Sequence, residues 1–224
     1  MNEHAIYMGY DPALTRSYTA ALRSITQFDD HPPVIPLILS NLRDMGVYTR
    51  PDDPKASNEF AHTRFLVPYL NKFRGWALFV DSDVIFLENP SQLFGLANPR
   101  YAVQVIKHDY TPASNTKMDG KVQTVYPRKN WSSVMLWNCA HPGARELTPE
   151  FIGAPDTTWA DLHRFTWLDD SEIGELPKEW NWLVGYYKEP KDGSPKLLHY
   201  TDGTPQFEAY RDCEYADEWY KFAD

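Results

Sequence analysis

The sequence predicts a single α/β domain in which helices flank a mainly parallel sheet. Apolar segments of strand length alternate along the chain with segments whose apolar residues recur at helical spacing, a pattern typical of this class. Trp76–Val80 (WALFV) is apolar throughout, as expected for a strand that is buried on both faces. A chain of 224 residues is long enough for one domain with a substantial core.

Turn and cap signals define the first predicted elements. Residues 5–10 (AIYMGY) are typical of a strand, which ends in the turn signal Gly-Tyr-Asp-Pro. Asp11 can cap the next helix, predicted over residues 13–25, with Pro12 in its first turn. Residues 34–39 are predicted to form the second strand.

The remaining chain predicts one further helix and four strands. Apolar residues at helical spacing predict a helix over residues 59–70, and Pro68 should kink this helix or lie near its end. Apolar runs predict strands at residues 76–80, 101–106, 134–137 and 196–200. Prolines and glycines punctuate residues 142–155, so we expect a surface loop there.

Charge and composition narrow the classes of function. The net charge is -9 and no run of Lys or Arg occurs, which disfavours binding to duplex nucleic acid. The two cysteines, Cys139 and Cys213, are too few for a disulfide scaffold and do not have metal-ligand spacing. No signal peptide is visible, and no apolar run approaches the roughly 20 residues that a membrane span needs. We therefore expect a cytoplasmic protein; its oligomeric state cannot be inferred.

Two carboxylates follow the buried strand directly, in Asp81-Ser82-Asp83. Carboxylates at such a position are costly unless a cation neutralises them, and their oxygens suit Mn²⁺ or Mg²⁺. In an open α/β sheet, ligands bind beyond the carboxyl ends of the strands. The motif therefore predicts a metal that holds a diphosphate; the alternative is an acidic turn.

His199 ends the last predicted strand and is followed closely by Gly203. A histidine at this position can complete a metal site, and a glycine lets a backbone N–H approach a phosphate. Alone, such a histidine is more often a surface or satisfied residue than a ligand. Together with Asp81 and Asp83, His199 is predicted to be a metal ligand.

Three separated motifs resemble those of GT-A glycosyltransferases. Residues 65–94, which contain Asp81-Ser82-Asp83, are most similar to the retaining group that includes glycogenin and the lipopolysaccharide galactosyltransferases. Residues 130–138 (NWSSVMLWN) resemble that group's Asn-Ser-Gly-Val-Met-Leu-Ile-Asn strand, and residues 199–205 (HYTDGTP) resemble its His-x-x-Gly loop. The three motifs occur in the order found in the family.

The resemblance implies a GT-A fold and the transfer of a sugar from a nucleotide-sugar, expected to be a UDP-sugar. Asp81, Asp83 and His199 would hold the Mn²⁺ or Mg²⁺ cofactor, and the sugar would keep its anomeric configuration. The acceptor, whether a glycan, a protein, a small molecule or a modified nucleobase, is not identified by the sequence.

Further residues are expected to bind the nucleotide under this resemblance. They are Tyr10, Asp11, Arg64, Ser82 and Gly203. Arg64 would contact the donor phosphates, unless it is a solvated helix charge. Tyr10 would stack on the base, unless it is a core or edge tyrosine.

The chain departs from the family pattern at several positions. Ser132-Ser133 stands where the family has Ser-Gly, and no lysine follows Gly203 to hold a phosphate. The nearest match to the family's Asp-Gln-Asp motif is Asp169-Asp170, which would lie near the sugar hydroxyls or the reacting face. The alternative is that these two aspartates cap a helix.

The resemblance divides the domain into a nucleotide-sugar half, about 1–106, and an acceptor and metal-closing half, about 107–210. Residues 107–128 are long for a connection and are predicted to close over donor or acceptor, or to form a plain excursion. A nucleotidyltransferase is an alternative, but the Gly-rich basic loop that would follow its first strand is missing. A DNA-base-modifying glycosyltransferase and a catalytically idle carbohydrate-binding domain are further alternatives.

Overall fold

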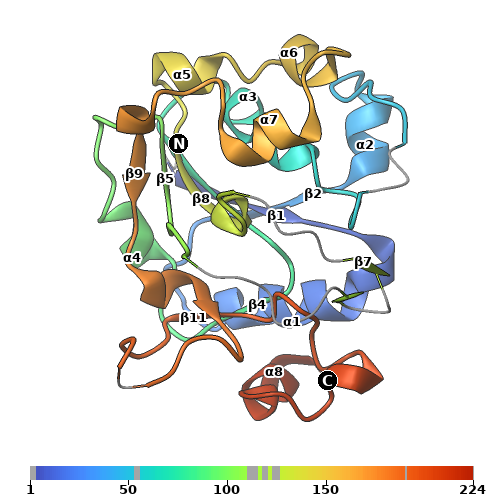
Figure 1. Cartoon of the computed structure of the whole chain (residues 1–224), viewed down its shortest axis with the longest axis vertical. Helices are drawn as coiled ribbons and strands as arrows, with labels where there is room; N and C mark the ends of the chain where they lie inside the picture. The colour runs from blue at the N-terminus through green and yellow to red at the C-terminus, as the bar shows by residue number, and fades with distance from the viewer. Residues whose placement is uncertain are drawn as a thin grey trace.

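A six-stranded sheet forms the centre of the computed structural model, which describes residues 4–52, 56–109, 116–117, 121–122, 127–189 and 191–223 (Figure 1). The strand order is β2-β1-β3-β8-β5-β9. These strands are β1 (His4–Gly9), β2 (Val34–Leu37), β3 (Trp76–Val80), β5 (Val103–Val105), β8 (Val134–Asn138) and β9 (Ile173–Glu175). The predicted α/β class is therefore confirmed, with β9 as a strand that the sequence did not predict.

One strand of this sheet runs against the others. β1 is parallel to β2 and β3, and β5 is parallel to β9, whereas β8 is antiparallel to both β3 and β5. The register sets Val134 opposite Val80 and Met135 opposite Val105. The chain thus leaves β5 and enters β8 at the same edge, which reverses β8. We call this edge, where β1, β2, β3, β5 and β9 end, the carboxyl edge.

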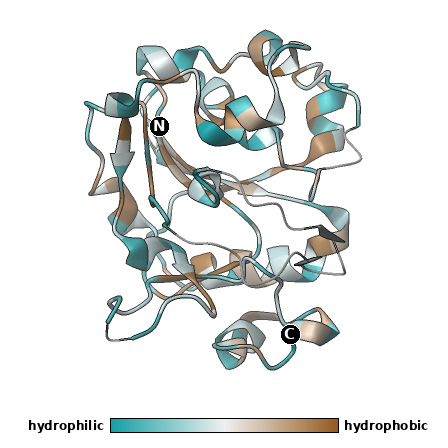
Figure 2. Cartoon of the chain, in the orientation of Figure 1, coloured by the Kyte–Doolittle hydropathy of each residue, from teal (hydrophilic) through white to brown (hydrophobic). Residues whose placement is uncertain are grey.

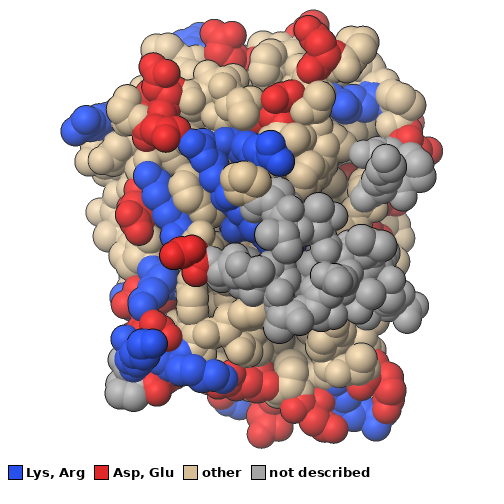
Figure 3. Space-filling model, viewed as in Figure 1, with Lys and Arg blue, Asp and Glu red and all other residues tan. Residues whose placement is uncertain are grey.

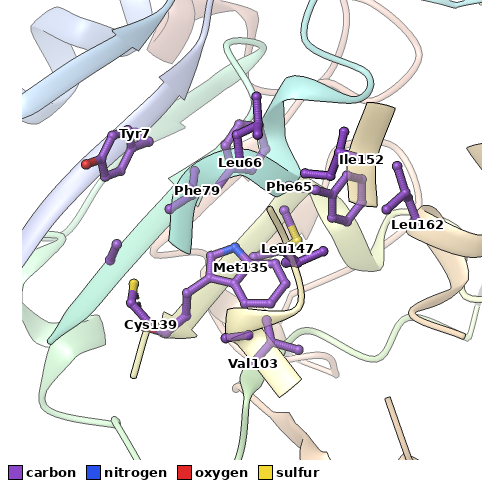
Figure 4. Packing of buried hydrophobic residues seen from close by; sticks show 14 of the residues in the cluster. Tyr7, Phe65, Leu66, Phe79, Val103, Met135, Cys139, Leu147, Ile152 and Leu162 are labelled. Carbon is purple, nitrogen blue, oxygen red and sulfur yellow. Dashed lines mark hydrogen bonds between the residues drawn. The ribbon is translucent and has the colours of Figure 1, made fainter. Parts of the chain in front are cut away.

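Side chains of alternate residues in the central strands pack into two separate cores, one on each face of the sheet. Tyr7 and Phe79 pack on one face of the sheet, in a cluster with residues of the helices α5, α6 and α7 (Figure 4). Ile6 and Leu78 pack on the other face, with residues of α1 and α4. Both faces are covered, which explains why β3 is apolar at every position; Figure 2 shows the hydrophobic residues concentrated along these strands.

A smaller sheet lies on the α1 side, in the order β10-β11-β4. It consists of β4 (Val84–Phe86), β10 (Trp182–Leu183) and β11 (Leu197–His199). Residues of this sheet form a third core with the C-terminal helix α8, in which Trp182 and Trp219 are fully buried. The loop between β3 and β4 connects this smaller sheet to the central one.

The helices surround both sheets. The α-helices are α1 (Thr15–Thr26), α2 (Leu39–Asp44), α3 (Val67–Leu70), α4 (Ser91–Phe94), α5 (Pro142–Arg145), α6 (Pro149–Gly153), α7 (Trp159–Arg164) and α8 (Ala216–Ala223). Short 3-10 helices are η1 (Pro12–Leu14), η2 (Thr63–Leu66), η3 (Trp131–Ser133), η4 (Asp170–Glu172), η5 (Lys178–Asn181) and η6 (Glu208–Tyr210). A separate pair of strands, β6 (Thr116–Lys117) and β7 (Lys121–Val122), is antiparallel.

Two predicted elements differ from the structure. Residues 59–70 form turns followed by η2 and α3 instead of one helix, and Pro68 lies in the first turn of α3. The loop predicted at residues 142–155 is wrong, because α5 and α6 occupy it. Pro142 and Pro149 begin these helices, where the absence of an N–H has no consequence.

The loop predicted to close over the substrate, residues 107–128, lies for the most part outside the described residues. Among the residues that the structure describes, no helix has the length and apolar character that a membrane crossing requires.

Candidate active site

The Asp81-Ser82-Asp83 segment connects the two sheets at the carboxyl edge. It follows β3 of the central sheet and precedes β4 of the smaller sheet. The N–H of Asp81 donates to the Ser133 carbonyl at 2.9 Å, and the Asp83 carbonyl accepts the N–H of Tyr200 at 2.9 Å. These bonds fix the segment between the start of β8 and the end of β11.

His199 joins the two aspartates because β11 pairs antiparallel with β4, which sets His199 opposite Val84. The Nε2 atom of His199 lies 3.5 Å from Oδ1 of Asp83. One ligand atom from each of Asp81, Asp83 and His199 lies within 4.8 Å of the other two. The structure thus brings together the three residues predicted to be metal ligands, and we call them the triad.

The triad fits a divalent cation. Carboxylate oxygens and an imidazole nitrogen are ligands that Mn²⁺ and Mg²⁺ accept. The side chains of Asp81, Asp83 and His199 are only 13%, 12% and 2% exposed, respectively. Two carboxylates in so little water repel each other unless positive charge offsets them. A cation at this position would supply that charge.

Arg64 supplies part of this charge in the structure. Its guanidinium forms an ion pair with Asp81, with 2.7 Å between Nη1 and Oδ1. The same group donates to the Ser132 carbonyl at 2.9 Å and to the Phe60 carbonyl at 3.2 Å, and it is 4% exposed. Arg64 is therefore not a solvated helix charge. Its anionic partner here is Asp81, and its predicted contact with donor phosphates stays a prediction.

The first cavity lies where β1 and β2 reach the carboxyl edge. It has a volume of about 400 Å³, and its lining includes Asp11, Arg43, Tyr48, Asn58 and His62. Asp11 accepts the N–H of Ala13 at 2.9 Å and that of Glu59 at 3.2 Å, so its carboxylate caps η1 and holds the cavity wall.

Tyr10 adjoins this region without lining the cavity. Its hydroxyl is 3.2 Å from Oγ1 of Thr15, and its ring meets Tyr18 edge to face. These contacts are those of an edge tyrosine. Stacking of Tyr10 on a nucleotide base stays a prediction.

A second cavity, of about 500 Å³, lies where β5 and β9 end. Its lining includes Lys107, Asp109, Glu175, Lys178 and Tyr187. These charged groups can donate and accept hydrogen bonds, and the ring of Tyr187 offers a flat apolar surface. Figure 3 shows Lys and Arg side chains gathered near the centre of one face, so the negative total charge conceals a local basic region.

His108 contacts Tyr187, which lines the second cavity, and lies near His199 of the triad. Its Nδ1 atom lies 2.6 Å from the hydroxyl of Tyr187. Burial lowers the pKa of His108 to about 3, and the neighbouring His199 acts in the same direction. His108 is therefore neutral at neutral pH. A lone histidine after a strand carries no distinguishing signal, so His108 was not among the predicted site residues.

Three predicted site residues have local partners of their own. Asp169 and Asp170 precede the amino end of β9, away from the carboxyl edge, and the structure does not bring them into the triad. Asp169 forms a capping box with Glu172, and Asp170 pairs with Arg128. The N–H of Gly203 donates to the Tyr200 carbonyl at 2.9 Å, within a turn. Their predicted roles toward sugar and phosphate stay predictions, as does that of Ser82, which is fully buried.

Comparison with known proteins identifies one close relative. The chain is 47% identical over 219 residues to Protein CDI of Arabidopsis thaliana, and the match covers 96% of this chain and 83% of the relative. No protein-family model matches the chain.

Solved structures of glycosyltransferases share the fold. WbbM, a bifunctional glycosyltransferase, superposes with a TM-score of 0.67 at 16% identity over 98% of this chain and 49% of its own. GlyE of Streptococcus pneumoniae TIGR4 superposes with a TM-score of 0.63 at 16% identity, and the match covers 98% of this chain and 59% of GlyE. The galactosyltransferase LgtC, solved with donor and acceptor sugar analogues, superposes with a TM-score of 0.56 at 10% identity. The match covers 98% of this chain and 95% of LgtC. The chain thus spans about half of WbbM and three fifths of GlyE, and the GT-A fold is confirmed.

Proposed function

The chain belongs to the family of Protein CDI of Arabidopsis thaliana, and we propose from its GT-A fold and its triad that it is a metal-dependent glycosyltransferase. It moves a sugar from a nucleotide-sugar, in our proposal a UDP-sugar, to an acceptor hydroxyl with retention of configuration. LgtC, which has the same fold, was solved with donor and acceptor sugar analogues, which supports this substrate class.

The triad is the observation that carries the proposal. Asp81 and Asp83 follow a buried strand at the carboxyl edge, and His199 reaches them from a different sheet. If Asp81-Ser82-Asp83 were only an acidic turn, no reason would exist for a histidine of another sheet to lie beside both carboxylates. A metal site provides that reason. Mn²⁺ or Mg²⁺ held there would offset the negative charge that develops on the leaving nucleoside diphosphate.

The first cavity supports a nucleoside site. It lies beside the turn after β1 and has a volume of about 400 Å³, enough for a nucleoside. In the proposal, Tyr10 and Asp11 border the nucleoside, and Ser82, Gly203 and Arg64 lie on the phosphate side. Arg64 acts there partly through Asp81, which it holds in place.

The second cavity supports an acceptor site. Its carboxylates and lysines can exchange hydrogen bonds with hydroxyl groups, and the ring of Tyr187 offers a flat surface. It opens at the same edge as the triad, so an acceptor bound there would approach a sugar held by the donor diphosphate.

Hydrolysis of UDP-sugars, a slow side reaction of such enzymes in the absence of acceptor, tests the proposal. Release of UDP from a panel of UDP-sugars should require Mn²⁺ or Mg²⁺ and should cease in EDTA. Asp83→Ala should abolish it while far-ultraviolet circular dichroism stays unchanged. Full activity in EDTA or in Asp83→Ala would refute metal dependence, and release of pyrophosphate from UTP and a sugar phosphate would indicate a nucleotidyltransferase.

A further inference from the structure

A chain of buried hydrogen bonds runs from the backbone to the far side of His199. The Nδ1 atom of His199 lies 2.8 Å from Oδ1 of Asn181. The Nδ2 atom of Asn181 donates to the Ser133 hydroxyl at 2.8 Å, and that hydroxyl donates to the Asn130 carbonyl at 2.7 Å. Asn181, Ser133 and His199 are at most 2% exposed, so water does not compete with these bonds.

The direction of each bond in this chain follows from the carbonyl at its end. A carbonyl can only accept, so the Ser133 hydroxyl gives its hydrogen to Asn130. The Ser133 oxygen must then accept from the NH₂ group of Asn181, which turns the amide oxygen toward His199. That oxygen can only accept, so Nδ1 of His199 carries the ring hydrogen and Nε2 carries the lone pair.

Asp83 favours the opposite tautomer of His199. Its Oδ1 atom lies 3.5 Å from Nε2 of His199, and a carboxylate so close favours a hydrogen on Nε2. An Nε2 that carries a hydrogen cannot bind a cation. The contact with Asn181 is shorter, at 2.8 Å, and it holds the hydrogen on the opposite nitrogen.

We infer that Asn181 and Ser133 are positioning residues that fix the tautomer of His199 and so make Nε2 available to the metal. This inference rests on the proposed function, since it concerns the same metal site. A partner that orients a metal-binding histidine typically contributes 10–100-fold to metal affinity.

The tautomer can be measured directly in the metal-free protein. Long-range ¹H–¹⁵N spectra of the full chain, labelled at histidine and recorded near pH 8, distinguish the two ring nitrogens, and His199→Gln assigns the signals. The wild type should carry the hydrogen on Nδ1. Asn181→Leu, which removes the acceptor, should move it toward Nε2, and titration with Mn²⁺ alone should show an affinity lower by about 10–100-fold. Asn181→Asp keeps an acceptor for Nδ1 and should keep the tautomer, and its added negative charge should not lower the Mn²⁺ affinity.

Ser133→Ala provides a milder variant in case Asn181→Leu does not fold. It should yield a mixture of tautomers and a smaller loss of Mn²⁺ affinity. Ser24→Ala is the matched control, since Ser24 is fully buried, makes two hydrogen bonds and lies on α1. Ser24→Ala should change neither quantity.

Two outcomes separate the inference from the proposed function. An unchanged tautomer and unchanged Mn²⁺ affinity in both Asn181→Leu and Ser133→Ala would overturn the inference while leaving the metal site intact. Absence of Mn²⁺ binding by the wild type would contradict the proposed function, whereas the spectra of the metal-free protein would still decide the tautomer.

Discussion

Arg64 and Asp81 illustrate how one buried residue serves both stability and the site. The side chains of this ion pair are 5% and 13% exposed, and the guanidinium lies 5.2 Å and 5.0 Å from the ring centres of Phe60 and Phe79. Taking a guanidinium out of water is costly, and its partner carboxylate and two backbone carbonyls compensate. The pair therefore holds Asp81 in position before any cation binds.

Loss of Arg64 should destabilise the protein and leave Asp81 uncompensated. Arg64→Met keeps much of the side-chain volume, and we expect it to lower the free energy of unfolding by about 3–5 kcal/mol in urea titrations. The double variant Arg64→Met/Asp81→Asn removes the lone charge and should recover part of the loss. If the double variant is as destabilised as the sum of the two single variants, the two groups do not interact.

His108 predicts a pH dependence of stability. Its pKa is near 6.5 in the unfolded chain and about 3 in the fold, chiefly because of burial. Between these values the unfolded state binds more protons, so the stability that His108 contributes is complete above pH 6.5 and is lost as the pH falls toward 3. The contribution to the slope is at most about 1.4 kcal/mol per pH unit.

Comparing the wild type with His108→Gln isolates the contribution of His108 to the pH dependence of stability. The glutamine side chain can still form a hydrogen bond with Tyr187. Urea titrations at pH 7, 6 and 5 should show a shallower decline for His108→Gln. Parallel profiles would mean that other groups cause the acid sensitivity.

The residues of the triad were predictable from sequence, whereas the residues that support them were not. Asp81 and Asp83 follow a recognisable strand, and His199 ends another. Asn181 and His108 reach the site only through the pairing of β11 with β4 and β10 and through contacts with Tyr187. No local pattern contains that information.

At the scale of elements, β1 ends against an aromatic ring. A Cβ atom at Gly9 would lie 2.3–2.6 Å from three atoms of the Phe60 ring, which is 2% exposed. Gly9→Ala should therefore lower the free energy of unfolding by about 1–3 kcal/mol, because overpacking forces the ring or the strand to shift. Gly95→Ala, where the nearest atom is 3.2 Å away, should have a smaller effect. Equal effects would refute the steric account.

Elements with a continuous apolar pattern were predicted well, whereas the stretch of residues 142–155, which prolines and glycines punctuate, was not. β3 and β8 match their predicted runs to within a residue. The direction of β8 was not predictable, because it depends on which edge the chain returns to. Residues 142–155 were misassigned because proline marks both turns and helix starts, and only the packing of Ile152 and Ala144 against the core distinguishes the two.

At the scale of the whole molecule, the triad joins two sheets that already share part of a core, because Val84 and Leu197 of the smaller sheet pack in one cluster with Leu78 of the central sheet. Asp81 follows β3 in the central sheet, and His199 belongs to β11 in the smaller one. The covalent link between the sheets at this point is the short Asp81-Ser82-Asp83 segment. A cation bound by all three side chains would add a further connection between the sheets, so its effect should extend beyond the loop.

Mn²⁺ should therefore stabilise both sheets together. A ligand that binds only the folded state, at a free concentration of about 100 times its Kd, raises the free energy of unfolding by about 2.7 kcal/mol. For a chain of this size, that increase corresponds to a rise in Tm of roughly 5–10 °C. Hydrogen exchange should slow at the amides of β3 and of β11 alike, because opening either sheet would break the site. Asp83→Ala should abolish both effects. Protection confined to the Asp81–Asp83 loop, or an unchanged rise in Tm in Asp83→Ala, would show that the ion binds without linking the two sheets.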